Sequence, residues 1–175
     1  MSLGDRSPDR ALNTTFSARR LAIMAALIAL SAVGSFIKIP GPLGSIALDA
    51  APGFFAALGF GAWPGFLVIA IGHLLSASLT GFPLSLPVHI AIAIGMGGCA
   101  LLFRWLGRRS RAMLVVALVV TSLANSLGLG LILLPIGGWG MYLGAIPSLL
   151  LGAVVNLAIA ALAYLSLRNS RLLDS

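Results

Sequence analysis

Polar side chains able to bind a ligand are few in this sequence, and several recur at helical spacing. His73, Ser76 and Thr80 lie at positions i, i+3 and i+7, which share one face of a helix. His89 falls near the start of the next apolar run, where a helix N-terminus carries a partial positive charge. Hydroxyl and imidazole groups in an apolar setting suit a small, mostly flat, neutral molecule with hydroxyl or amide groups.

Two later apolar runs add amide side chains to this set. Asn125 lies beside Ser126, and Asn156 shares a helix face with Ser148 and Gly152. The segment 38–49 is punctuated by turn residues, so we expect an external loop there, and a second external loop near residue 139. The residues expected to converge on one outer binding cavity are Lys38, Asp49, His73, Ser76, His89, Asn125, Trp139, Tyr142 and Asn156.

Each of these residues also has a purely structural interpretation. Asp49 could cap the helix that follows it, and the two histidines could be hydrogen-bonded within the core. Asn125 and Asn156 could bond across helices. Trp139 and Tyr142 could anchor the chain at the membrane interface. The sequence leaves these alternatives open.

Catalytic chemistry is poorly supported by the residue types present. Asp49 is the only carboxylate near the apolar runs, whereas sites for hard cations use several oxygen ligands. No glycine-rich phosphate loop precedes Lys38, and no nucleophile elbow accompanies the histidines. Cys99 is the only cysteine, which excludes an internal disulfide and a thiolate metal cluster. We therefore expect no enzymatic activity, no metal site and no cofactor.

The composition indicates the environment that must position these residues. Of the 175 residues 59% are hydrophobic and 9% are charged, and the mean hydropathy is +1.08. A soluble domain carries about 25% charged residues, so this chain belongs in a lipid bilayer. The net charge of +7 comes from arginine clusters that bracket apolar runs, as expected for cytoplasmic loops and not for a nucleic-acid-binding face.

Apolar runs bounded by proline, glycine or arginine predict six membrane-crossing helices. The second is too short to span the bilayer unaided. The predicted ranges are 18–37, 50–61, 64–80, 86–103, 112–134 and 145–167. The resulting fold class is an all-α integral membrane protein, a six-helix bundle.

The charge distribution favours cytoplasmic placement of both termini. With six crossings, Lys38 alone of the 11 basic residues lies outside. We expect a flexible cytoplasmic tail over residues 1–17, a transmembrane substrate-binding domain over 18–168 and a short cytoplasmic tail over 169–175.

A strip of small residues on the first predicted helix could admit a neighbouring helix. Ala22, Ala26 and Ala29 recur at spacings that keep them on one side of the helix. Small residues let helices approach closely in a membrane. The strip would contact a partner subunit, or alternatively pack inside the same bundle.

Several segments together resemble the substrate-binding S components of energy-coupling factor (ECF) vitamin transporters. They include the alanine motif of residues 21–27, followed by Lys38-Ile39-Pro40 and by the segment 46–52. The segments 59–65 and 81–83 resemble the same family, and the likeness covers roughly residues 18–168.

The resemblance implies a division of labour among subunits. An S component in the bacterial cytoplasmic membrane binds a vitamin or its precursor from outside. A transmembrane coupling subunit and two ATPase subunits then drive uptake. Ala22 and Ala26 would face the coupling subunit, and the loop after the first helix would act as a lid.

The segments 135–140 and 152–158 look most like family members assigned to α-ribazole, a neutral benzimidazole riboside used for cobalamin synthesis. Biotin, pantothenate and riboflavin are the alternative substrates. Biotin or pantothenate would need Lys38 or the start of the fourth helix to meet its carboxylate. A self-sufficient small carrier or channel is the alternative outside the family.

Overall fold

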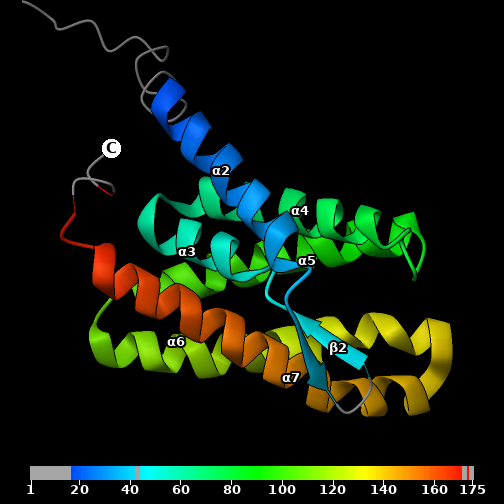
Figure 1. Cartoon of the computed structure of the whole chain (residues 1–175). Helices are drawn as coiled ribbons and strands as arrows, with labels where there is room; N and C mark the ends of the chain where they lie inside the picture. The colour runs from blue at the N-terminus through cyan, green and yellow to red at the C-terminus, as the bar shows by residue number, and fades with distance from the viewer. Residues whose placement is uncertain (1–16, 42–43, 171–172, 174–175) are drawn as a thin grey trace, which may run out of the picture.

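The computed structural model describes residues 17–41, 44–170 and 173, so most of each expected tail lies outside the described residues. Within that part the chain is almost entirely helical (Figure 1). The elements are α2 (Ala18–Gly34), β1 (Lys38–Gly41), β2 (Gly44–Ala47), α3 (Ala51–Gly59), α4 (Ala62–Leu79), α5 (Leu86–Gly107), α6 (Arg111–Leu123), the π-helical turn η1 (Ala124–Gly128), the 3-10 segment η2 (Leu129–Leu133) and α7 (Leu134–Leu167).

The first four expected helices correspond to α2, α3, α4 and α5, within a few residues at each end. Proline occupies the first turn of α3 and of α5, where its missing N–H has no intrahelical partner to lose. Gly81 follows α4 with a φ of 75°, the left-handed conformation expected of a glycine at a helix end. The segment 38–49, expected to be a loop, instead contains the antiparallel hairpin β1–β2.

The last two expected helices differ most from the structure. The run 112–134 is not one α-helix, because η1 and η2 follow α6. The helix expected to begin at residue 145 lies within α7, whose backbone is kinked and non-helical at Gly137 and Gly138, where Gly138 has a φ of 64°, so helical structure resumes before residue 145. A glycine accepts that conformation without the steric cost of a Cβ, so the chain turns here without a separate loop. Pro147, expected to open a helix, lies inside α7.

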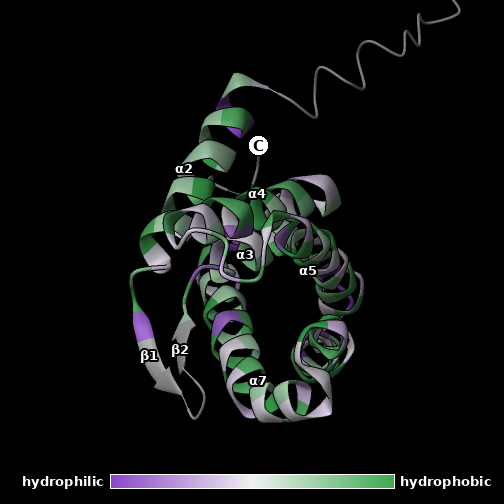
Figure 2. Cartoon of the chain, turned by 90° about the vertical axis from the view of Figure 1, so that its right-hand side faces the viewer, coloured by the Kyte–Doolittle hydropathy of each residue, from purple (hydrophilic) through white to green (hydrophobic). Residues whose placement is uncertain are grey.

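Among the described residues, three continuous helical stretches are long and apolar enough to cross a membrane by length and composition: Ala62–Leu79, Leu86–Gly107 and Arg111–Leu167. The last contains α6, both irregular turns and α7. In Figure 2 hydrophobic residues occur along all the labelled helices, as expected of segments that lie in a bilayer. The count of six crossings and the cytoplasmic placement of both termini remain predictions.

The short helix α3 lies at the centre of the bundle. Its residues from Ala51 to Leu58 are all buried, and it packs against α2, α4, α5 and α7 (Figure 1). Phe54 of α3 meets Phe103 of α5 edge to face, with ring centroids 5.6 Å apart. A buried helix of nine residues must still satisfy the backbone groups at both of its ends.

Side chains from other helices satisfy both ends of α3. Asn156 of α7 accepts hydrogen bonds from the backbone N–H groups of Ala50 and Ala51, at 3.1 and 2.8 Å. At the opposite end, Arg104 of α5 donates to the carbonyl of Ala57 at 2.7 Å, and Arg108 donates to that of Leu58 at 3.1 Å. Because water is scarce inside the bundle, these contacts replace the capping that solvent would provide.

Two arginines thus have a role that the sequence did not indicate. We interpreted the cluster around residues 104–111 as a signal of membrane orientation. Arg104 and Arg108 also act as C-terminal caps of α3, and Arg108 donates to the hydroxyl of Tyr164 at 2.9 Å.

Glycines allow α3 and α4 to lie almost backbone to backbone. A Cβ on Gly65 of α4 would stand 2.4 Å from the Cα and Cβ atoms of Ala57, and one on Gly53 of α3 would stand 2.4 Å from the Cβ of Ile69. Such approaches are possible only without a side chain. They are the small-residue packing typical of membrane helices.

Candidate ligand-binding cavity

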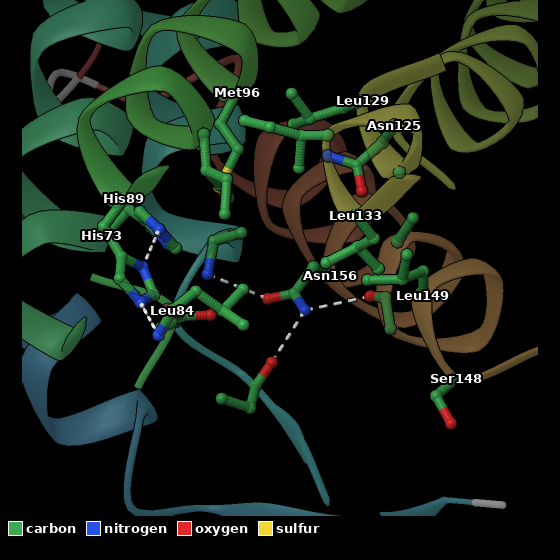
Figure 3. A pocket seen from close by; sticks show the side chains of 18 of the residues that line it. His73, Leu84, His89, Met96, Asn125, Leu129, Leu133, Ser148, Leu149 and Asn156 are labelled. Carbon is green, nitrogen blue, oxygen red and sulfur yellow. Dashed lines mark hydrogen bonds between the residues drawn. The ribbon is translucent and has the colours of Figure 1, made fainter. Parts of the chain in front are cut away.

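A cavity of about 330 Å³ opens between the segment that precedes α3 and the helices α4, α5 and α7, with η1 and η2 on its far side (Figure 3). Its walls are mostly apolar. The polar residues that line it are Asp49, His73, His89, Asn125, Ser148 and Asn156, and the apolar ones include Phe54, Met96, Leu129, Leu133 and Leu149. A volume of this size lies within the range of small-molecule sites, which is about 300–1,000 Å³.

The two histidines form a hydrogen-bonded pair on one side of the cavity. The Nε2 atom of His73 and the Nδ1 atom of His89 are 3.2 Å apart. The backbone N–H of Leu84 approaches Nε2 of His89 at 3.5 Å, so this nitrogen is assigned as an acceptor and Nδ1 carries the proton. His89 then donates to His73, and the pair is neutral.

Asp49 lies just before α3, close to the helix N-terminus. Burial raises the pKa of its carboxyl group above the ordinary value, while nearby backbone N–H groups and the Ser76 hydroxyl act in the opposite direction. Ser76 is buried but makes no hydrogen bond of ordinary geometry, so its influence on Asp49 comes from proximity. Ser76 and His73 are one turn apart on α4, so Asp49 and the histidine pair belong to one polar corner of the cavity.

Asn156 lines the cavity, yet the protein uses all the hydrogen-bonding capacity of its amide. Its oxygen caps α3, as described above, and its nitrogen donates to the carbonyls of Ala47 and Gly152 at 3.0 and 2.9 Å. The side chain therefore ties the end of β2, the start of α3 and the middle of α7 together. The structural alternative considered for Asn156 matches these contacts.

Asn125 reaches the cavity from an irregular part of the chain. It belongs to the π-helical turn η1 and lies beside the thiol of Cys99. A π-helical turn inserts a wider ring of backbone into a helix and often marks a functional site. Figure 3 places Asn125 and Ser148 on the side of the cavity opposite the histidines.

The other expected site residues do not line the cavity. Lys38 is exposed on β1, and Trp139 is 66% exposed on α7. Tyr142 is buried but directs its hydroxyl to the carbonyl of Leu127 at 3.0 Å, where it satisfies the irregular backbone of η1. Ser76 is close to Asp49 but is not among the residues that line the cavity. The bend at Gly138 places residues 139–142 on a helix, whereas we expected them in a loop over the site.

The apolar walls were not predicted as site residues. Met96, Leu129, Leu133 and Leu149 line the cavity, yet they are indistinguishable in type from lipid-facing residues nearby. Of the lining residues that were not among the expected site residues, only Ser148 and Gly152 stood out in the sequence, because they share a helix face with Asn156.

The alanine strip lies on an open face of α2. Ala22, Ala26 and Ala29 are all exposed, and Leu30 and Val33 on the same helix are 54% and 59% exposed. Packing of the strip inside the bundle is therefore wrong for this structure, and a contact with another molecule stays a prediction.

Comparisons with known proteins give two results. The sequence model of the family described as "ECF transporter, substrate-specific component" matches residues 19–169. A solved structure described as "Structure and mechanism of the S component of a bacterial ECF transporter" shares the fold, with a TM-score of 0.70 and 24% identity, covering 88% of this chain and 98% of that one. No curated protein matches in sequence.

Proposed function

We propose that this chain, which belongs to the family of substrate-specific (S) components of ECF transporters, captures a vitamin or vitamin precursor in the cavity between α3, α4, α5 and α7. Members of this family are membrane subunits that bind a small molecule and associate with ATPase and transmembrane subunits. They are transport subunits and not enzymes. The binding place and the identity of the substrate are the parts that we propose.

The observation that carries the proposal is the chemistry of the cavity. Its apolar walls suit a flat ring system, while Asn125, Ser148 and the polar corner at Asp49 offer hydrogen bonds to hydroxyl or amide groups. α-Ribazole is our first candidate because it combines an apolar benzimidazole with the hydroxyl groups of ribose and has no net charge. Biotin, pantothenate and riboflavin are the alternatives within the same family.

Native mass spectrometry and calorimetry on the purified chain test the proposal. We expect one ligand per chain to be retained or to bind from a panel of α-ribazole, biotin, pantothenate and riboflavin, with α-ribazole the tightest. Tight binding of another member of the panel would change the assigned substrate and leave the proposed capture in this cavity intact. Absence of binding across the panel and of any retained ligand would count against capture in this cavity.

Uptake experiments distinguish an S component from a self-sufficient carrier. Liposomes that contain this chain alone should not accumulate the ligand, whereas addition of the coupling subunit and ATPases with ATP should give uptake. Accumulation by the chain alone would favour the carrier.

Substituting Ala26→Trp should block assembly with the coupling subunit while leaving ligand binding unchanged. Ala26 lies on the exposed strip of α2, so a bulky side chain there disturbs no internal contact but prevents close approach of another helix. Ala22→Trp should act in the same way. The measurement is co-purification with the coupling subunit and ATPases, together with calorimetry of ligand binding.

The matched control is Val115→Trp, because Val115 is 65% exposed on α6, on a different helix. This variant should assemble normally. If Ala26→Trp assembled as well as Val115→Trp, the partner surface would lie elsewhere.

A further inference from the structure

The cavity wall contains one acidic side chain and, among the described residues, no lysine or arginine. Asp49 is this acidic side chain, and it is the only formally charged one among the described residues that line the cavity. Lys38, the basic residue closest to Asp49 in the sequence, is exposed on β1. An anionic ligand would therefore meet a carboxylate without a compensating cation.

The N-terminus of α3 is also unable to receive an anion. Such a helix end attracts negative charge through its free N–H groups. Here the N–H groups of Ala50 and Ala51 already donate to the Oδ1 atom of Asn156. Asp49 stands at the same helix end, so the favourable field of that end already serves a protein carboxylate.

The polar groups across from Asp49 are neutral or already paired. His73 and His89 bond to each other, and the backbone N–H of Leu84, just before α5, is directed to His89. The second residue of α5 is Pro87, which has no N–H to offer. The far side of the cavity presents Asn125 and Ser148, which are uncharged (Figure 3).

We propose that Asp49 is the charge-selecting residue of the site, and that the ligand is a neutral or cationic molecule whose hydroxyl, amide N–H or ammonium groups donate to it. This inference rests on the proposed function, since it places the ligand in the cavity. Asn125 and Ser148 meet a second polar group at the other end of the ligand, and the apolar walls hold the part between.

Pairs of probes, each an uncharged molecule and an anionic derivative on the same skeleton, test this selection. The first pair is α-ribazole and its 5′-phosphate ester, and the second is panthenol and pantothenate, an alcohol and a carboxylate on one skeleton. Dissociation constants are measured by calorimetry on the full chain in lipid nanodiscs. The chain variants are wild type, Asp49→Asn, and the control Arg111→Gln, which removes an exposed charge at the start of α6.

The wild-type chain should bind the uncharged member of a pair at least about tenfold more tightly than its anionic partner. Asp49→Asn keeps the side-chain volume and removes the charge, so it should reduce this ratio several-fold, whereas Arg111→Gln should leave it unchanged. If Asp49→Asn does not fold, the wild-type ratio alone decides.

Equal or tighter binding of the anionic members by the wild-type chain would overturn the charge selection and leave the proposed function intact. An unchanged ratio in folded Asp49→Asn would overturn the role of Asp49. Failure of every probe to bind, together with the absence of a retained ligand, would instead contradict the proposed function and this inference with it.

Discussion

Substituting Asn156→Ala is expected to lower the stability of the folded chain by about 3 kcal/mol or more, because three buried or partly buried backbone groups lose their partner and each such loss costs about 1–3 kcal/mol. The N–H groups of Ala50 and Ala51 would lose their acceptor, and the carbonyl of Ala47 would lose its donor. The measurement is thermal or denaturant unfolding in detergent, followed by the far-ultraviolet circular dichroism signal.

The matched control is Asn169→Ala, since Asn169 is exposed after the end of α7. Its stability should stay within about 0.5 kcal/mol of the wild-type chain, as for surface substitutions generally. Asn156→Asp refines the test, because a carboxylate can accept from both N–H groups but cannot donate to Ala47. An Asn156→Ala chain as stable as Asn169→Ala would mean that the amide is not the link between β2, α3 and α7.

Substituting Gly65→Ala is expected to destabilise the bundle by about 2–3 kcal/mol or to prevent its folding, as overpacked cores do. The added Cβ would lie 2.4 Å from the Cα and Cβ atoms of Ala57, so the backbones of α3 and α4 must separate to admit it. Expression level, monodispersity in detergent and the unfolding midpoint report the loss.

Gly98→Ala is the corresponding control and should not lower the stability of the folded chain. Gly98 lies within α5 and a Cβ there meets nothing within 4 Å. Alanine favours a helix over glycine by about 1 kcal/mol, so this variant should be as stable as the wild type or more stable. Equal destabilisation by both substitutions would show that loss of glycine flexibility matters, and not the contact of α4 with α3.

The boundaries of the early helices could be predicted because physical breaks mark them. Pro52 and Pro87 lie in the first turns of α3 and α5, and Gly81 adopts a positive φ after α4. Between residues 112 and 167 no charged residue occurs, and hydrophobicity is nearly uniform. The π-helical turn and the 3-10 segment therefore left no periodic signal by which they could be located, whereas the bend at Gly138 falls within the break expected near residue 139.

Part of the candidate site could be predicted because polar residues are costly inside a membrane and hence informative. Asp49, His73, His89, Asn125 and Asn156 all line the cavity. Whether each contacts a ligand is a separate question that residue type cannot answer, since the amide of Asn156 is fully occupied by the protein.

The expectations for Lys38, Trp139 and Tyr142 depended on which way two connecting segments fold. The hairpin exposes Lys38. The bend at Gly138 places Trp139 and Tyr142, whose rings contact each other, away from the cavity. Arg104 and Arg108 were missed as caps for the opposite reason. Their position at the end of an apolar run already had a sufficient explanation in membrane orientation.

Side chains of other helices cap both ends of α3, and this limits how the molecule can open. Since α7 holds one end of this helix and α5 holds the other, α3 cannot fray at its termini without breaking contacts to two neighbours. Its amide hydrogens should then exchange with solvent only when the whole bundle opens, as in the most protected cooperative unit of a protein. Local openings, which cost less free energy and give faster exchange, would be left to α2 and the β1–β2 hairpin.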